Sequence, residues 1–161
     1  MLLKNLFRIV NVYKFSLITI IFFELIYLIK GYKGNRFNFS NNDSMTDNFP
    51  CPYYFLFKIK KTLKNTNFRN FIDLGCGSGR TIDFYNKNFS NKNFVGIEYF
   101  TNQYEYCKKI FYKQKNIEIV QADFTKLNFL KYNPDCYFIT NPFKKKVEFI
   151  NFIEKLINFS L

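Results

Sequence analysis

The sequence FIDLGCGSGR, residues 71–80, places three glycines at alternate positions behind an apolar run that ends in an acid. The chain has 161 residues and only 6 glycines, so half of them fall within five positions. A chain that leaves a strand and turns directly into a helix often needs positive φ angles, which glycine adopts without steric cost. Glycine also lets a ligand approach the backbone and the free N–H groups of the helix N-terminus. The stretch therefore predicts a strand, a ligand-binding turn and a helix.

The spacing of these glycines excludes two common nucleotide-binding loops. A dinucleotide fingerprint, G-x-G-x-x-G, would need a glycine where Arg80 stands. A phosphate-binding loop of the form G-x-x-x-x-G-K-[ST] is absent from the sequence. The pattern present is D-x-G-x-G-x-G, formed by Asp73, Gly75, Gly77 and Gly79. Neither of the first two loops therefore explains the stretch.

Strand-like and helix-like segments alternate around this turn. Short apolar segments predict four strands, at residues 70–73, 94–100, 117–120 and 135–140. Helical spacing of apolar residues predicts helices at residues 50–64, 77–89, 102–115 and from 144 onward. Asn102 and Glu105 fit a capping box at the start of the third of these helices. The order predicts an α/β fold with an open, mainly parallel sheet, which binds ligands at the carboxyl ends of its strands.

The glycine stretch resembles the first motif of class I S-adenosylmethionine-dependent methyltransferases. The resemblance implies a Rossmann-like sheet with flanking helices, and S-adenosyl-L-methionine as the cofactor. It also implies that the cofactor contacts Asp73, Gly75, Cys76, Gly77 and Gly79.

Three later segments extend the resemblance. Glu98 ends the second predicted strand, where the family carries an acid that binds the ribose hydroxyls. Asp123 and Phe124 follow the third strand, where the family carries an acid or amide near the adenine. The segment Asn141-Pro142-Phe143 follows the fourth strand, where many members carry a catalytic or substrate-facing motif. A looser likeness connects the chain to small bacterial methyltransferases whose substrate is unassigned.

The family core has seven strands, and this sequence ends after the fourth and its helix. We therefore expect residues 51–161 to form a partial methyltransferase domain. Either the sequence is a fragment or truncated product, which we favour, or another copy or a partner completes the sheet.

The absence of histidine excludes several chemistries. Without it, Ser-His-Asp and Cys-His nucleophile systems and His-ligated metal sites cannot be built. The 4 cysteines form no C-x-x-C pair, so we expect buried thiols and no metal site. Methyl transfer is an in-line displacement that depends on positioning rather than on a histidine base. It is therefore compatible with this composition.

The first 30 residues contain an apolar stretch, FSLITIIFFELIYLI at residues 15–29, which is shorter than the ~20 residues that span a bilayer. Glu24 interrupts it. Three interpretations remain open: a membrane anchor, an apolar helix packed on the domain, and a cleaved signal. Residues 31–50 are polar and predict a linker or lid. The sequence thus predicts a membrane-associated protein with a cytoplasmic catalytic domain, or alternatively a cytoplasmic one.

The chain is basic, with 24 Lys and Arg against 12 Asp and Glu and a formal net charge of +12. Such an excess is typical of proteins that bind nucleic acid or anionic membranes, but the lysines are scattered, with one tight cluster at residues 144–146. The favoured function is methyl transfer to a protein side chain or small molecule. The alternatives are a nucleic-acid amino-methyltransferase and a truncated, non-catalytic, membrane-tethered relative.

Overall fold

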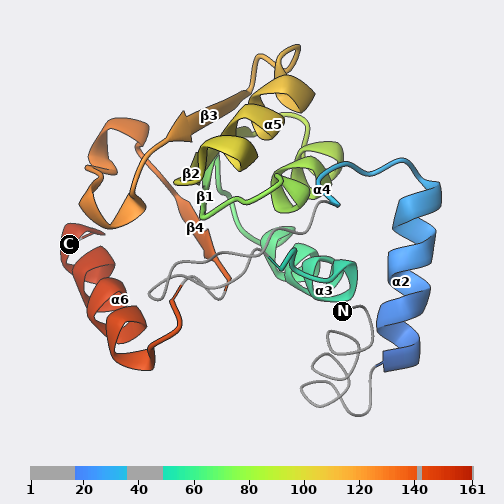
Figure 1. Cartoon of the computed structure of the whole chain (residues 1–161), viewed down its shortest axis with the longest axis horizontal. Coiled ribbons are helices and arrows are strands. Elements are labelled where there is room, and N and C mark those ends of the chain that lie inside the picture. The colour runs from blue at the N-terminus through green and yellow to red at the C-terminus, as the bar shows by residue number, and fades with distance from the viewer. Residues whose placement is uncertain (1–16, 36–48, 141–142, 161) are drawn as a thin grey trace.

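The computed structural model describes residues 17–35, 49–140 and 143–160, which contain one four-stranded sheet (Figure 1). Its strands are β1 (Asn70–Leu74), β2 (Asn93–Glu98), β3 (Ile117–Gln121) and β4 (Cys136–Ile139). They lie in the order β3-β2-β1-β4, and every pairing is parallel. The predicted α/β fold with a parallel sheet is therefore confirmed.

The order of the strands reverses at β1. The chain moves outward from β1 through β2 to β3, and then crosses back to place β4 on the other side of β1. Such a reversal opens a crevice at the carboxyl ends of the two strands that flank it. The segment from residue 75 to 79, called the glycine loop below, leaves β1 at this point.

The helices divide between the two faces of the sheet. On one face lie α3 (Tyr53–Leu63), α4 (Arg80–Asn88) and α5 (Thr101–Phe111), whose buried side chains share one core cluster. The other face carries two short 3-10 helices, η1 (Phe124–Lys126) and η2 (Leu130–Tyr132), and α6 (Lys146–Ser160).

The strand sequence accounts for both cores. Because side chains alternate across a strand, neighbouring residues of β1 point to opposite faces. Phe71 lies in the core beside α4, whereas Ile72 lies in the core beside α6, and both are fully buried. The continuous apolar strands are typical of a parallel sheet that is covered on both sides.

The predicted capping box at the start of α5 is wrong. The helix begins at Thr101, and its N-cap is Phe100, which makes no side-chain capping bond. Asn102 therefore stands inside the first turn, where the backbone is already helical, and it cannot act as the cap.

The apolar N-terminal stretch forms α2 (Leu17–Ile29), which packs against α3. The Tyr27 ring stacks on that of Tyr53 at 4.8 Å, and the Phe23 ring lies 5.2 Å from that of Phe57. Within the described ranges, no helix is long and apolar enough to cross a membrane. A full membrane span would have to extend the stretch N-terminally to residues 10–13, which lie outside those ranges. The described part of the stretch is thus a helix packed on the domain.

Candidate functional site

The glycine loop leaves β1 in a conformation that favours glycine. The φ angles of Gly75, Gly77 and Gly79 are 77°, 54° and 81°. A Cβ atom on Gly79 would meet the Phe111 ring at 2.6 Å, so α4 begins where α5 leaves no room for a side chain. A Cβ atom on Gly75 would meet only the Phe124 ring, at 3.8 Å. The loop is therefore closely packed at its end and has space at its start.

Glu98, at the end of β2, holds the glycine loop in place. Its carboxylate accepts a hydrogen bond from the Gly77 N–H at 2.8 Å and another from the Phe100 N–H at 2.8 Å. The side chain is buried, and this burial raises the pKa of the carboxyl while the backbone hydrogen bonds oppose the rise. Each carboxylate oxygen keeps further acceptor capacity. The bond to Gly77 could not be predicted from sequence, because it joins residues 21 positions apart.

Asp73 lies buried beneath the loop without a full set of partners. Its residue is 2% exposed, and among the described residues its Oδ2 atom has no hydrogen-bond partner. Burial raises the pKa of this carboxyl to about 8, the Glu98 charge adds to the rise, and a hydrogen bond with Thr81 opposes it. A buried acceptor without a partner is costly. A cationic ligand group next to Oδ2 would supply the partner.

Asp123 caps the turn that follows β3. Its Oδ1 atom accepts from the Thr125 N–H at 3.0 Å and from the Thr125 hydroxyl at 2.6 Å. Burial tends to raise the pKa of Asp123, but these bonds and nearby Lys126 bring it below the usual value. The next residue, Phe124, is buried and lies opposite Gly75. The turn therefore brings these two predicted site residues toward the start of the glycine loop.

The remaining predicted site residues differ in how the structure places them. Cys76 is buried, its N–H donates to Ile97, and hydrogen bonding to Cys107 followed by burial raises the pKa of its thiol. Phe143 packs on Phe124, with ring centroids 5.7 Å apart. The predicted catalytic residues Asn141 and Pro142 lie outside the described residues.

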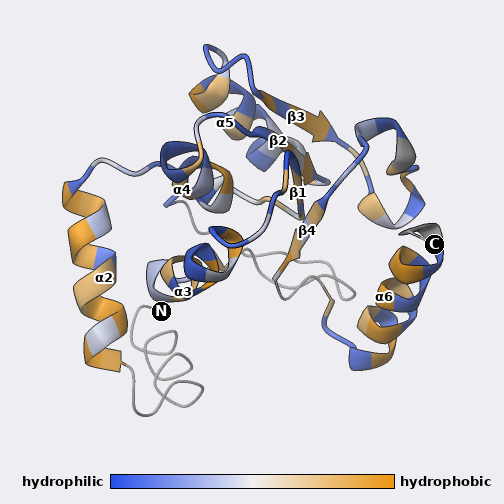
Figure 2. Cartoon of the chain, turned by 180° about the vertical axis from the view of Figure 1, so that it is seen from behind, coloured by the Kyte–Doolittle hydropathy of each residue, from blue (hydrophilic) through white to orange (hydrophobic). Residues whose placement is uncertain are grey.

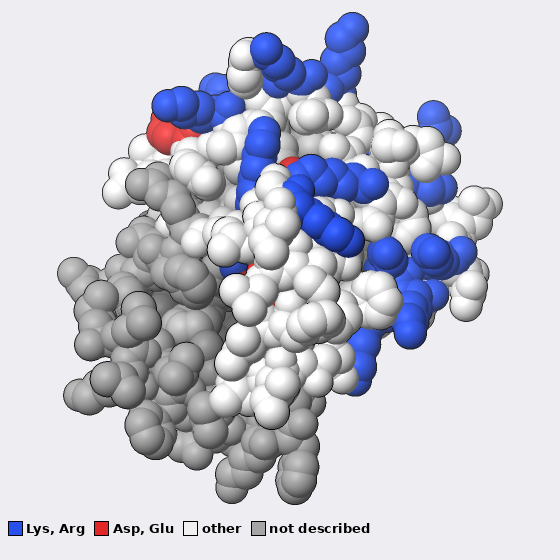
Figure 3. Space-filling view, turned by 90° about the vertical axis from the view of Figure 1, so that its right-hand side faces the viewer, with Lys and Arg blue, Asp and Glu red and all other residues white. Residues whose placement is uncertain are grey.

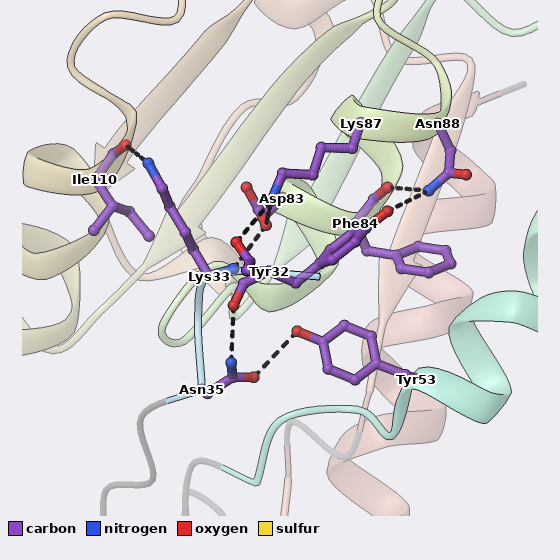
Figure 4. Close-up of polar contacts among 10 residues, drawn as sticks. Tyr32, Lys33, Asn35, Tyr53, Asp83, Phe84, Lys87, Asn88 and Ile110 are labelled. Atoms are coloured by element: carbon purple, nitrogen blue, oxygen red, sulfur yellow. Dashed lines mark hydrogen bonds and ion pairs between the residues drawn. The ribbon is translucent and has the colours of Figure 1, made fainter. Parts of the chain in front are cut away.

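Sequence reasoning missed a strap, residues 31–35, that binds to the start of α4 (Figure 4). The Lys33 N–H donates to Asp83 Oδ2 at 2.7 Å, and the Lys33 ammonium donates to the Ile110 carbonyl at 3.2 Å. The Ser78 hydroxyl, within the glycine loop, donates to the Gly34 carbonyl. The start of the predicted linker is thus bound to both α4 and the glycine loop. In the sequence, the one indication that the strap lies close to the glycine loop is the glycine at position 34.

A partly buried ion pair also connects α2 to the start of α4. Arg80, the first residue of α4, places its Nη1 atom 2.8 Å from Glu24 Oε2, and the guanidinium lies 4.5 Å from the centre of the Tyr53 ring. Glu24 accepts from the Tyr53 N–H as well, at 2.8 Å. In the sequence, Glu24 is only an interruption of an apolar stretch. In the structure it neutralises the arginine next to the loop.

Three acids thus lie at or near the carboxyl ends of adjacent strands in a chain of net charge +12. Asp73 lies in β1, Glu98 ends β2, and Asp123 follows β3. Their carboxyl groups can accept hydrogen bonds or pair with a positively charged group.

Residues 71–156, more than half of the chain, match the family described as "Methyltransferase domain". The chain belongs to this family, the class I S-adenosylmethionine-dependent methyltransferase domains. No curated protein matches the chain.

Several solved structures are similar to part of the chain. The plantazolicin methyltransferase BpumL, in complex with SAH, is 19% identical over 53% of this chain and 32% of that one, with a TM-score of 0.43. The methyltransferase domain of bacterial CtHen1 is 22% identical over 52% and 47%, with a TM-score of 0.47. PKMT2 from Rickettsia typhi, in complex with AdoHcy, is 20% identical over 44% and 14%, with a TM-score of 0.41. The matched region spans less than half the length of each of these proteins.

Proposed function

We propose that the chain binds S-adenosyl-L-methionine at the carboxyl ends of β1, β2 and β3, and that it serves methyl transfer. The observation that carries the proposal is the buried, incompletely paired Asp73 carboxyl beneath a loop of three positive-φ glycines. At neutral pH this cofactor carries positive charge on its sulfonium and its amino group. Both the acids and the family membership support this choice of ligand.

We propose distinct roles for the site residues. The backbone of residues 75–79 lies against the aminoacyl end of the cofactor, with Asp73 as the nearest acidic group. Glu98 accepts hydrogen bonds from the ribose hydroxyls through the acceptor capacity that its two backbone bonds leave. Asp123 and Phe124 face the adenine, which the position of the Phe124 ring close to Gly75, at the start of the glycine loop, supports.

The bound cofactor supplies a methyl group on a sulfonium sulfur, which a lone pair on the acceptor displaces. The chain therefore has to position the acceptor and exclude water. We propose the segment Asn141-Pro142-Phe143 for the acceptor side of the site. The cluster of Phe143 with Phe124 and Phe152 supports an aromatic wall there. For the acceptor we propose a protein side chain or a small molecule.

We also propose that the domain works beside a membrane, on its cytosolic side, where S-adenosylmethionine is made. The apolar character of α2, with only part of its surface covered by α3, supports this placement.

Titration calorimetry on the full chain tests the cofactor proposal. We expect binding of S-adenosylmethionine and S-adenosylhomocysteine but not of NAD. Gly77→Val should abolish binding, because a β-branched residue at φ 54° distorts the loop. Gly31→Val is the matched control, because Gly31 also has a positive φ, of 67°, but its Cβ would meet nothing within 4 Å. Normal binding by a folded Gly77→Val protein would refute the role of the loop. Incorporation of label from a methyl-labelled cofactor then identifies the acceptor.

A further inference from the structure

The helix α2 has one covered face and one exposed face. Phe23 and Tyr27 pack on α3, whereas a run of large apolar residues faces outward with 44% to 86% of its surface exposed: Ile18, Ile21, Phe22, Leu25, Leu28 and Ile29. Figure 2 shows the helix as hydrophobic along most of its length. An exposed apolar patch of this kind marks an interaction surface. We call these six residues the α2 face.

Lysines lie beside α2, on the neighbouring helix α3. Lys58 lies over the Tyr54 ring at 4.5 Å and Lys61 over the Phe57 ring at 5.1 Å, and both rings pack against Phe23 of α2. Figure 3 shows the side of the molecule on which α2 lies. Lys and Arg atoms lie above and to the right of an uncharged area there, and few acidic atoms are visible. The surface thus combines an apolar band with positive charge beside it.

The single acid of α2 does not change this charge. Glu24 is turned toward the domain, where it binds Arg80 and the Tyr53 N–H. The sequence of α3, YYFLFKIKKTL, contains no acid either. A second copy of the chain would therefore bring lysines against lysines, which is repulsive. The complementary occupant is apolar in its middle and negatively charged around it.

We propose that the α2 face and the lysines beside it bind the surface of an anionic lipid bilayer, with α2 lying in the plane of the interface. An amphipathic helix with lysines beside its apolar face inserts to the boundary between headgroups and acyl chains, and the lysines meet anionic headgroups. The inference rests on the membrane placement proposed above and specifies the binding face and the lipid charge. It does not depend on cofactor binding.

Vesicle co-sedimentation of the full chain tests the proposal. We expect binding to vesicles of phosphatidylcholine with phosphatidylserine, much weaker binding to phosphatidylcholine alone, and loss of binding as salt is raised. Leu25→Gln with Leu28→Gln should weaken binding about tenfold, because two side chains leave the apolar boundary. The matched control is Val147→Gln with Ile157→Gln on α6, whose exposed fractions of 66% and 55% resemble the 61% and 55% of Leu28 and Leu25.

The lysines are tested separately. Lys58→Gln with Lys61→Gln should weaken binding to the anionic vesicles about tenfold, because each lysine near an anionic surface contributes to the free energy of binding. Lys109→Gln with Lys113→Gln, on and just after α5, should leave binding unchanged.

The outcomes separate this inference from the broader membrane placement. No binding to either kind of vesicle would overturn both. Binding that the α2 variants and the α6 control reduce equally would overturn the α2 face alone, and equal binding to both kinds of vesicle would overturn the anionic lipid. A dimer that Leu25→Gln with Leu28→Gln dissociates, without vesicle binding, would identify a second copy as the occupant and overturn the proposal.

Discussion

Among single residues, Glu98 has two roles, one in the structure of the glycine loop and one in the proposed cofactor site. It holds the glycine loop through the Gly77 N–H, and in our proposal it also accepts from the cofactor ribose. A substitution at this position therefore acts on the loop as well as on the ligand. The loss of cofactor affinity should come with a loss of protein stability.

Glu98→Gln should weaken binding of S-adenosylhomocysteine by about 1–3 kcal/mol, because an amide cannot accept from both N–H groups with the strength of a carboxylate. Calorimetry and thermal unfolding of the same samples measure the two effects together. Glu105→Gln, at an exposed site on α5, is the control. Unchanged affinity in Glu98→Gln would remove Glu98 from the cofactor site.

Asp73 makes the stability of the cofactor-free protein depend on pH. Its pKa is raised to about 8 in the folded protein from a model-compound value of 3.8, so the unfolded chain releases this proton first as pH rises. The contribution of Asp73 to stability is therefore complete below pH 4 and is lost as pH rises toward about 8, by up to about 1.4 kcal/mol per pH unit.

Asp73→Asn cannot titrate. Denaturant unfolding at a series of pH values should therefore show the variant gaining stability relative to the wild type between pH 4 and 8. A difference between the two proteins that is constant over this range would mean that Asp73 is ionised throughout, and it would contradict the assigned environment.

The turn at residues 75–79 could be predicted from sequence because its cause is local. Alternate glycines after an apolar strand have few uses other than a turn at positive φ. The bonds from Gly77 to Glu98 and from Ser78 to Gly34 could not be predicted, because they join distant residues whose types are common in many roles. The missing hydrogen-bond partner of Asp73 Oδ2 could not be predicted either, because it depends on which groups surround the buried side chain.

At the scale of elements, α2 and the strap behave as part of the domain. The ion pair of Glu24 and Arg80 and the bonds from residues 31–35 to α4 fix the start of the helix that follows the glycine loop. The sequence alone left three interpretations of residues 15–29 open, because a mostly apolar stretch has no polar face that would orient it. The direction in which Glu24 points settles how the described helix sits on α3.

Glu24→Gln should destabilise the protein by about 1–3 kcal/mol, because it leaves the buried Arg80 guanidinium without its counter-charge. We expect weaker cofactor binding as well, since Arg80 begins α4. Denaturant unfolding and calorimetry measure the two effects.

Glu148→Gln removes the exposed ion pair with Lys145, whose atoms are 3.7 Å apart, and should change stability by less than about 0.5 kcal/mol. If Glu24→Gln behaved like this control, the pair with Arg80 would not support the glycine loop.

At the scale of the whole molecule, the parallel sheet and the order of its helices followed from the alternation of apolar strands with helical periods. The strand pairing brings acids that are far apart in sequence to the carboxyl ends of adjacent strands, and this placement makes the site rich in carboxyl groups. The net charge of +12 instead suggests an anionic partner, because a net charge does not show where the acids lie in the structure. The local concentration of acids, rather than the net charge, agrees with a cationic cofactor.

Binding of S-adenosylmethionine by the glycine loop can be measured directly on the full chain. It has 6 glycines, so selective ¹⁵N-glycine labelling gives an NMR spectrum with one amide signal for each. On addition of S-adenosylhomocysteine, we expect large shifts for Gly75, Gly77 and Gly79 and none for Gly31, with signals assigned by single substitutions. If the signals of the three loop glycines stay unchanged while the ligand is bound, the glycine loop is not the cofactor site.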